Sequence, residues 1–64
     1  MREAELWARM EEVLGSSYAH AWADLVVMAE LGGRSVSEAI EAGLPFKKIW
    51  RAVWAQLELS ETLR

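Results

Sequence analysis

The strongest hydrophobic pattern in the sequence lies between residues 17 and 31. Apolar residues recur there with the spacing of one helix face: Tyr18, Ala21, Trp22, Leu25, Val26 and Ala29. The opposite face is also mostly apolar, through Val27, Met28 and Leu31. A helix that is apolar on nearly all sides is usually buried. The pattern therefore predicts a central helix over residues 17–31, with the other elements packed around it.

Two flanking segments, residues 2–14 and 45–58, have the pattern of amphipathic helices. The apolar face of the first consists of Leu6, Trp7, Met10, Val13 and Leu14. The apolar face of the second consists of Phe46, Ile49, Trp50, Val53 and Leu57. Gly15 is suited to end the first helix and Pro45 to begin the second. Residues 60–64 are expected either to add a helical turn or to fray, as chain ends do.

A shorter helix is predicted over residues 36–42. The pair Gly32-Gly33 allows a sharp change of direction, and Ser35 and Glu38 then have the spacing of a capping box. No segment alternates with a period of two over a useful length, so we predict no strand. The sequence thus predicts an all-α fold: a small orthogonal bundle of about four helices, at about 2–14, 17–31, 36–42 and 45–58, in a single domain covering 1–64.

The composition limits how such a fold can be stabilised. A chain of 64 residues buries only about 60% of the surface that its unfolded form exposes. It contains no cysteine and one histidine, so it has no disulfide and cannot supply the usual ligands of a structural zinc ion. Four tryptophans and a hydrophobic content of 53% must supply the core instead. We expect no metal and no cofactor.

The charge and the hydropathy pattern indicate where the protein acts. A net charge of −3 argues against general attraction to nucleic acid or to anionic membranes. The longest apolar run, residues 25–29, is far shorter than the roughly 20 residues that span a bilayer. Residues 1–5 lack the basic-then-apolar order of a signal peptide. We therefore expect a soluble cytoplasmic protein that does not interact with membranes.

Four sequence blocks, together with Gly43, give the chain a family resemblance. They are ELWxRM at 5–10, YAxxWA at 18–23, AELGGRSVxEA at 29–39 and IWRAV at 49–53. On these blocks the chain resembles a family of very short actinobacterial proteins classed as a domain of unknown function. The resemblance implies a compact helical protein of similar length. It implies no activity, ligand or catalytic residue, because none is established for the family.

The segment 35–58 has the spacing of a DNA-binding helix-turn-helix. The matching positions are Ala39, Gly43, Leu44, Ile49 and Ala52. The surrounding segment is also locally positive, through Arg34, Lys47, Lys48 and Arg51. The second helix would then lie in the major groove.

Three observations argue against this interpretation. Glu38 stands where such motifs usually bury an apolar residue. The second helix should offer polar groups to the bases, but Pro45, Phe46 and Trp50 occupy those positions. The whole chain is also acidic. We therefore favour the interpretation that this helix pair only stabilises the fold, and we keep DNA binding as the alternative hypothesis.

Ser17, His20 and Asp24 share one face of the predicted central helix and superficially offer a nucleophile, a base and an orienting acid. Ser17, however, stands at a capping position, and His20 and Asp24 are typical of the solvated side of a buried helix. Three side chains from adjacent turns of one helix provide no oxyanion hole. We therefore predict no catalytic residue and no enzyme activity.

Lys47, Arg51 and Trp54 follow one another at helical spacing on the last helix. Trp54 either folds back against the first helix, on Trp7 or Met10, or is exposed and offers a partner or dimer contact. Arg34 and Glu30 flank the glycine pair, where we expect a salt bridge that holds the turn.

These observations favour a non-enzymatic protein-interaction or regulatory module, which binds a protein partner or a second copy of itself. The alternative is a nucleic-acid-binding protein of the helix-turn-helix type that uses the 35–58 helix pair. The candidate contact residues for either function are Arg34, Lys47, Lys48, Arg51 and Trp54.

Overall fold

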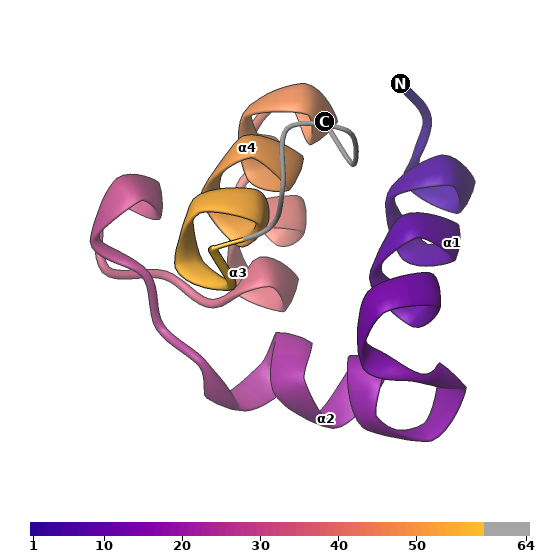
Figure 1. Cartoon of the computed structure of the whole chain (residues 1–64). Helices are drawn as coiled ribbons and strands as arrows, with labels where there is room; N and C mark the ends of the chain where they lie inside the picture. Colours follow the sequence, from indigo (N-terminus) through magenta and orange to yellow (C-terminus); the bar gives the residue numbers. More distant parts are fainter. Residues whose placement is uncertain (59–64) are drawn as a thin grey trace.

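Four α-helices follow one another in this computed structural model, which describes residues 1–58 (Figure 1). Their bounds are Glu3–Leu14 for α1, Ser16–Leu25 for α2, Val36–Glu41 for α3 and Phe46–Gln56 for α4. A single 3₁₀ turn, η1, covers Ala29–Leu31. The predicted all-α small bundle is therefore confirmed. The expectation for residues 60–64 lies outside the described residues.

The helices enclose one hydrophobic core. α1 packs on both α2 and α4, and α3 lies against α2 and α4, while η1 closes the core beside α4. In Figure 1, α2 crosses below the ends of the other helices. Every element contributes buried side chains: Leu6, Met10, Ala19, Trp22, Ala23, Met28, Leu31, Val36, Ala39, Ile49, Trp50, Ala52 and Val53. α4 contributes four of them, which makes it the most deeply embedded helix.

The predicted central helix over 17–31 is wrong, because α2 ends at Leu25. Val26 has extended backbone angles, φ −86° and ψ 118°, which suit a β-branched residue. The extended segment then gains a partner: the Met28 amide donates to the Arg34 carbonyl at 3.1 Å, in an isolated antiparallel bridge. Gly32 and Gly33, with φ of +72° and +77°, reverse the chain between these two residues.

The early end of α2 changes which residues are buried. Ala19, Trp22 and Ala23 form its buried face. The opposite side faces solvent, so Tyr18 is 58% exposed and Leu25 78% exposed, although both were expected in the core. Beyond the helix, Val27 is 57% exposed and Met28 is buried, as in an extended segment with alternating sides. α2 is therefore a surface helix rather than a central one.

The predicted capping box at the start of α3 is confirmed. Ser35 Oγ accepts a hydrogen bond from the Glu38 amide at 3.2 Å, and Glu38 Oε1 accepts one from the Ser35 amide at 2.9 Å. After α3, Gly43 has φ +81°, and the Leu44 amide donates to the Ala39 carbonyl at 3.1 Å. This turn leads directly into α4 and fixes the start of that helix at Pro45, its N-cap.

Candidate binding groove between α1 and α4

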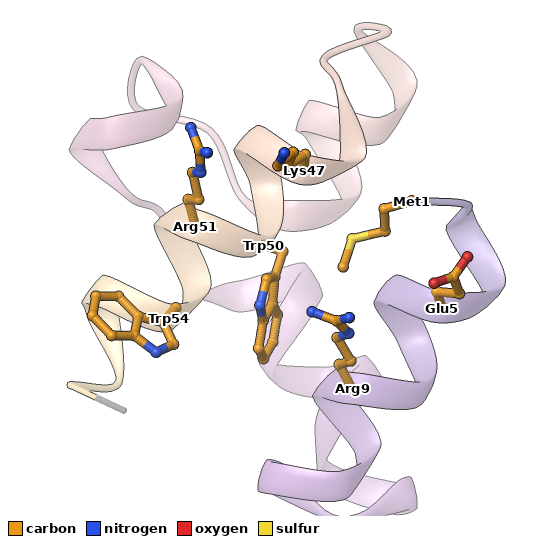
Figure 2. A pocket seen from close by; sticks show the side chains of 7 residues that line it. All are labelled: Met1, Glu5, Arg9, Lys47, Trp50, Arg51 and Trp54. Carbon is orange, nitrogen blue, oxygen red and sulfur yellow. The ribbon is translucent and has the colours of Figure 1, made fainter. Parts of the chain in front are cut away.

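A groove with a volume of about 480 Å³ lies between α1 and α4 (Figure 2). One wall comes from α1 and the segment before it, and the other from α4. The lining residues are Met1, Glu5, Arg9, Lys47, Trp50, Arg51 and Trp54. We call this feature the α1–α4 groove. Its volume lies within the range of roughly 300–1,000 Å³ typical of ligand-binding sites.

The α4 wall follows from the spacing of its residues. Lys47, Trp50, Arg51 and Trp54 lie at helical intervals and so share one side of the helix. The other side of α4 packs into the core through Ile49, Ala52 and Val53. Because the core holds α4 on that side, the groove wall is presented by a helix whose orientation is fixed.

Trp50 forms the base of the groove and contacts α1 through Arg9. The Trp50 side chain is only 4% exposed. The Cζ atom of Arg9 lies 5.8 Å from the centre of the Trp50 ring, within the range of a cation–π interaction. Trp50 Nε1 is buried and has no hydrogen-bond partner among residues 1–58. A donor of this kind is uncommon in native proteins, where most buried polar atoms are paired.

Trp54 combines features of the two alternatives that the sequence left open. Its side chain is half-buried and packs against the core, as a structural tryptophan does. It also lines the groove, one helical turn beyond Arg51. The indole therefore offers apolar surface at the rim of the groove.

The charges of the groove differ from those of the rest of the molecule. α4 carries Lys47, Lys48 and Arg51 and no acidic residue. Since the whole chain has a net charge of −3, the chain outside α4 carries −6. Among the described residues that line the groove, three are basic, Arg9, Lys47 and Arg51, and one is acidic, Glu5. Lys47 and Arg51 are exposed, so their charges act on approaching molecules.

The structure separates the candidate contact residues into two groups. Lys47, Arg51 and Trp54 meet in the α1–α4 groove, whereas Lys48 is exposed on α4 outside the groove lining. Arg34 instead supports the glycine turn, because its Nη1 donates to the Leu31 carbonyl at 3.2 Å.

The expected salt bridge between Glu30 and Arg34 is wrong for the chain as described, from Met1 to Glu58, where no such ion pair forms. The left-handed turn at Gly32 leaves the Leu31 carbonyl within reach of the guanidinium, which takes that acceptor instead.

In the apparent Ser-His-Asp constellation, His20 and Asp24 have separate partners. The expected capping position of Ser17 is wrong, because Ser17 lies inside α2, whose N-cap is Gly15. The His20 ring stacks on Trp7, with ring centres 4.4 Å apart, and its Nε2 lies 3.3 Å from Glu11 Oε2. Asp24 accepts a hydrogen bond from the Ser37 hydroxyl on α3. These contacts join helices to one another. Within residues 1–58, no three His, Cys, Asp or Glu side chains lie close enough together to hold a metal ion.

Sequence reasoning missed the α1 side of the groove. Arg9 is not among the apolar residues that define the inward face of the segment 2–14, so the pattern gives it no role in a site. A signal was present, since Arg9 lies one helical turn before Val13 and so stands at the edge of the apolar face. The pairing of α1 with α4, however, is a tertiary contact that no local pattern specifies.

A comparison of the sequence with protein-family models identifies a family for the chain. The described residues define a small all-α bundle with a cationic groove lined by tryptophan. The chain belongs to the DUF3046 family, described as a protein of unknown function, and the family model matches residues 1–61. No curated protein and no solved structure matched the chain. In the part that the structure describes, no helix has the length and hydropathy to cross a membrane.

Proposed function

We propose that the protein is a non-enzymatic interaction module that binds a partner protein through the α1–α4 groove. The observation that carries this proposal is the grouping of Lys47, Arg51 and Trp54 on one wall of the groove. Tryptophan and arginine are enriched among the residues that dominate binding energy at protein interfaces. A half-buried tryptophan one helical turn from an exposed arginine is therefore a good anchor for a partner.

Trp54 is less buried than Trp22 and Trp50, the two tryptophans of the core. Trp22 is 6% exposed and Trp50 is 4% exposed, so the fold is able to bury an indole almost completely. Trp54 keeps part of its surface on the groove although the chain has little core to spare. Binding a partner would remove this apolar surface from water, which favours association.

We also propose that the protein has no catalytic activity. The groove residues include no serine, threonine, cysteine or histidine, so the lining as described offers none of the common hydroxyl, thiol or imidazole groups of enzymes. His20 and Asp24 contact other helices instead. We also propose a cytoplasmic location, which the lack of cysteine supports.

Nucleic-acid binding by the α3–α4 pair is the second candidate function. It is favoured by Lys47, Lys48 and Arg51, which are all exposed on α4 after the turn at Gly43. It is weakened by Trp50 and Phe46, which are buried and half-buried and so leave fewer side chains for the bases. The negative charge of the remaining chain also repels the phosphates of a DNA backbone.

A site-specific photo-crosslinking experiment tests the proposal. Glu5, which lines the groove, is replaced by benzoylphenylalanine in cells that produce the chain, and Glu12, which is exposed on α1 outside the groove lining, is replaced in a matched control. The captured protein is then identified, purified and titrated calorimetrically against the wild-type chain and Trp54→Ala. We expect capture from position 5 but not from position 12, and binding weakened about tenfold or more by Trp54→Ala. Equal capture from both positions, or capture of nucleic acid, would overturn the proposal.

A further inference from the structure

We infer that the segment bound in the α1–α4 groove is acidic, with carboxylate side chains next to an apolar one. This inference rests on the proposed function and names the chemistry of the partner. The charge of the groove supports an acidic segment, and the unpaired donor at its base calls for an acceptor oxygen in that segment.

The charge of the groove selects a negative ligand. Lys47 and Arg51 lie one helical turn apart, an arrangement that destabilises a helix through repulsion unless an anion lies between them. A carboxylate can accept hydrogen bonds from both, and the planar guanidinium of Arg51 can hold it through two of them. The chain outside α4 has a net charge of −6, so it repels a negative segment on balance, whereas this helix attracts one.

The unpaired donor at the base of the groove calls for an acceptor oxygen in the ligand. An indole nitrogen can only donate, so the partner that Trp50 Nε1 lacks must be an acceptor. A carboxylate or backbone carbonyl oxygen of a bound segment would supply it. In Figure 2, this nitrogen lies on the edge of the ring toward Trp54. The donor therefore faces the part of the groove that Trp54 lines.

Trp54 indicates which type of side chain lies next to the carboxylates in the bound segment. It follows Arg51 by three residues, so an apolar side chain adjacent to a bound carboxylate would lie against the indole. A peptide also fits this groove better than a duplex does. A short segment can place its carboxylates beside Lys47 and Arg51 alone, whereas the continuous phosphates of a duplex would also face Glu5 on the α1 wall.

Peptide display on the folded full-length chain tests the inference even while the natural partner is unidentified. A random library is selected against the immobilised protein, and enriched peptides are measured by fluorescence polarisation. We expect enrichment of sequences that combine Asp or Glu with Phe, Leu or Trp. Their affinity should fall about tenfold in Arg51→Glu and change less than about threefold in Lys48→Glu, which alters the net charge of the same helix equally. Trp50→Phe should also weaken binding, because it removes the donor and keeps a ring.

The contrary outcomes separate the inference from the proposed function. Enriched peptides that are neutral or basic, yet lose affinity in Trp54→Ala, would overturn the inference and leave the proposed function intact. A library that yields no enriched peptide on folded protein would also overturn it. Polyglutamate or duplex DNA that binds as tightly as the selected peptides, with equal losses in Arg51→Glu and Lys48→Glu, would show a general cationic surface and overturn it as well.

Discussion

Arg9 and Trp50 join the two walls of the groove, with the Arg9 guanidinium carbon 5.8 Å from the centre of the indole ring. Arg9 lies on α1 and Trp50 on α4, so the contact links helices that are distant in sequence (Figure 2). The half-buried guanidinium also keeps a positive charge inside the groove. The same residue therefore contributes to the stability of the fold and to the proposed recognition of acidic ligands.

Removing this contact should destabilise the fold. In Arg9→Ala we expect the free energy of unfolding to fall by at least about 0.5–1 kcal/mol, the range of a cation–π pair. Arg9→Lys should lose less, because an ammonium group can still approach the ring. Urea denaturation monitored by tryptophan fluorescence measures both. Arg2→Ala, at an exposed position, is the control and should leave the midpoint unchanged. An equal loss in Arg2→Ala would contradict this role of Arg9.

The stacked pair of Trp7 and His20 should hold α1 to α2. The rings are 4.4 Å apart and 15° from parallel. We expect His20→Ala to cost about 0.5–1.5 kcal/mol of stability, the range of an aromatic pair. His20→Phe keeps the ring and should cost clearly less, although it loses the contact with Glu11. Thermal unfolding followed by circular dichroism measures both variants. If they are equally destabilised, stacking is not the source of the effect.

The capping box at α3 should be the most sensitive polar element of the fold. Ser35 is 1% exposed and caps a helix of six residues, which has few other hydrogen bonds to hold it. We expect Ser35→Ala to cost about 1–2 kcal/mol. Ser37→Ala, two residues further on and half-buried, should cost less, because it loses only the bond to Asp24. Chemical denaturation of the two variants gives the comparison, and a larger loss in Ser37→Ala would contradict it.

The two glycines of the turn should respond differently to alanine. Both have positive φ, so each substitution places an alanine in a left-handed conformation that costs about 1–2 kcal/mol. A Cβ atom at Gly32 would also lie 2.8 Å from Arg34 Nη1, whereas the space at Gly33 is open. Gly32→Ala should therefore displace the guanidinium and break its hydrogen bond to Leu31.

A double-mutant cycle isolates this second effect. Arg34→Ala should destabilise the wild-type chain by about 0.5–1.5 kcal/mol, the value of a hydrogen bond. In the Gly32→Ala background it should have almost no effect, since the bond is already lost. Strict additivity of the two substitutions would show that the guanidinium does not lie over Gly32.

Local sequence patterns were sufficient to predict α1, α3 and α4. The apolar spacing of Phe46, Ile49, Trp50 and Val53 matches one helix face, and Ser35 with Glu38 forms a cap that depends on nearby residues alone. These elements could be predicted without reference to what they pack against. The same pattern placed Lys47, Arg51 and Trp54 on a common side of α4.

The segment from Val26 to Leu31 could not be assigned in this way. An unbroken apolar run fits either a buried helix or an extended chain, because its periodicity does not distinguish the two. The pairing of Met28 with Arg34 across the glycine turn stabilises the extended conformation of this segment. The hydrophobic periodicity does not reveal that pairing. The α1 wall of the groove escaped prediction for a related reason, since Arg9 meets Trp50 only in the folded chain.

The four tryptophans allow the binding site to be located directly. Each indole N–H gives its own signal in a ¹H–¹⁵N NMR spectrum, and Trp7 and Trp22 lie outside the groove lining while Trp50 and Trp54 belong to it. Titration with an acidic peptide from the display selection should shift the Trp50 and Trp54 signals and leave those of Trp7 and Trp22 in place. The Trp50 signal should move downfield, as a proton does when it gains an acceptor. Shifts confined to Trp7 and Trp22, or equal shifts of all four signals, would contradict binding in the α1–α4 groove.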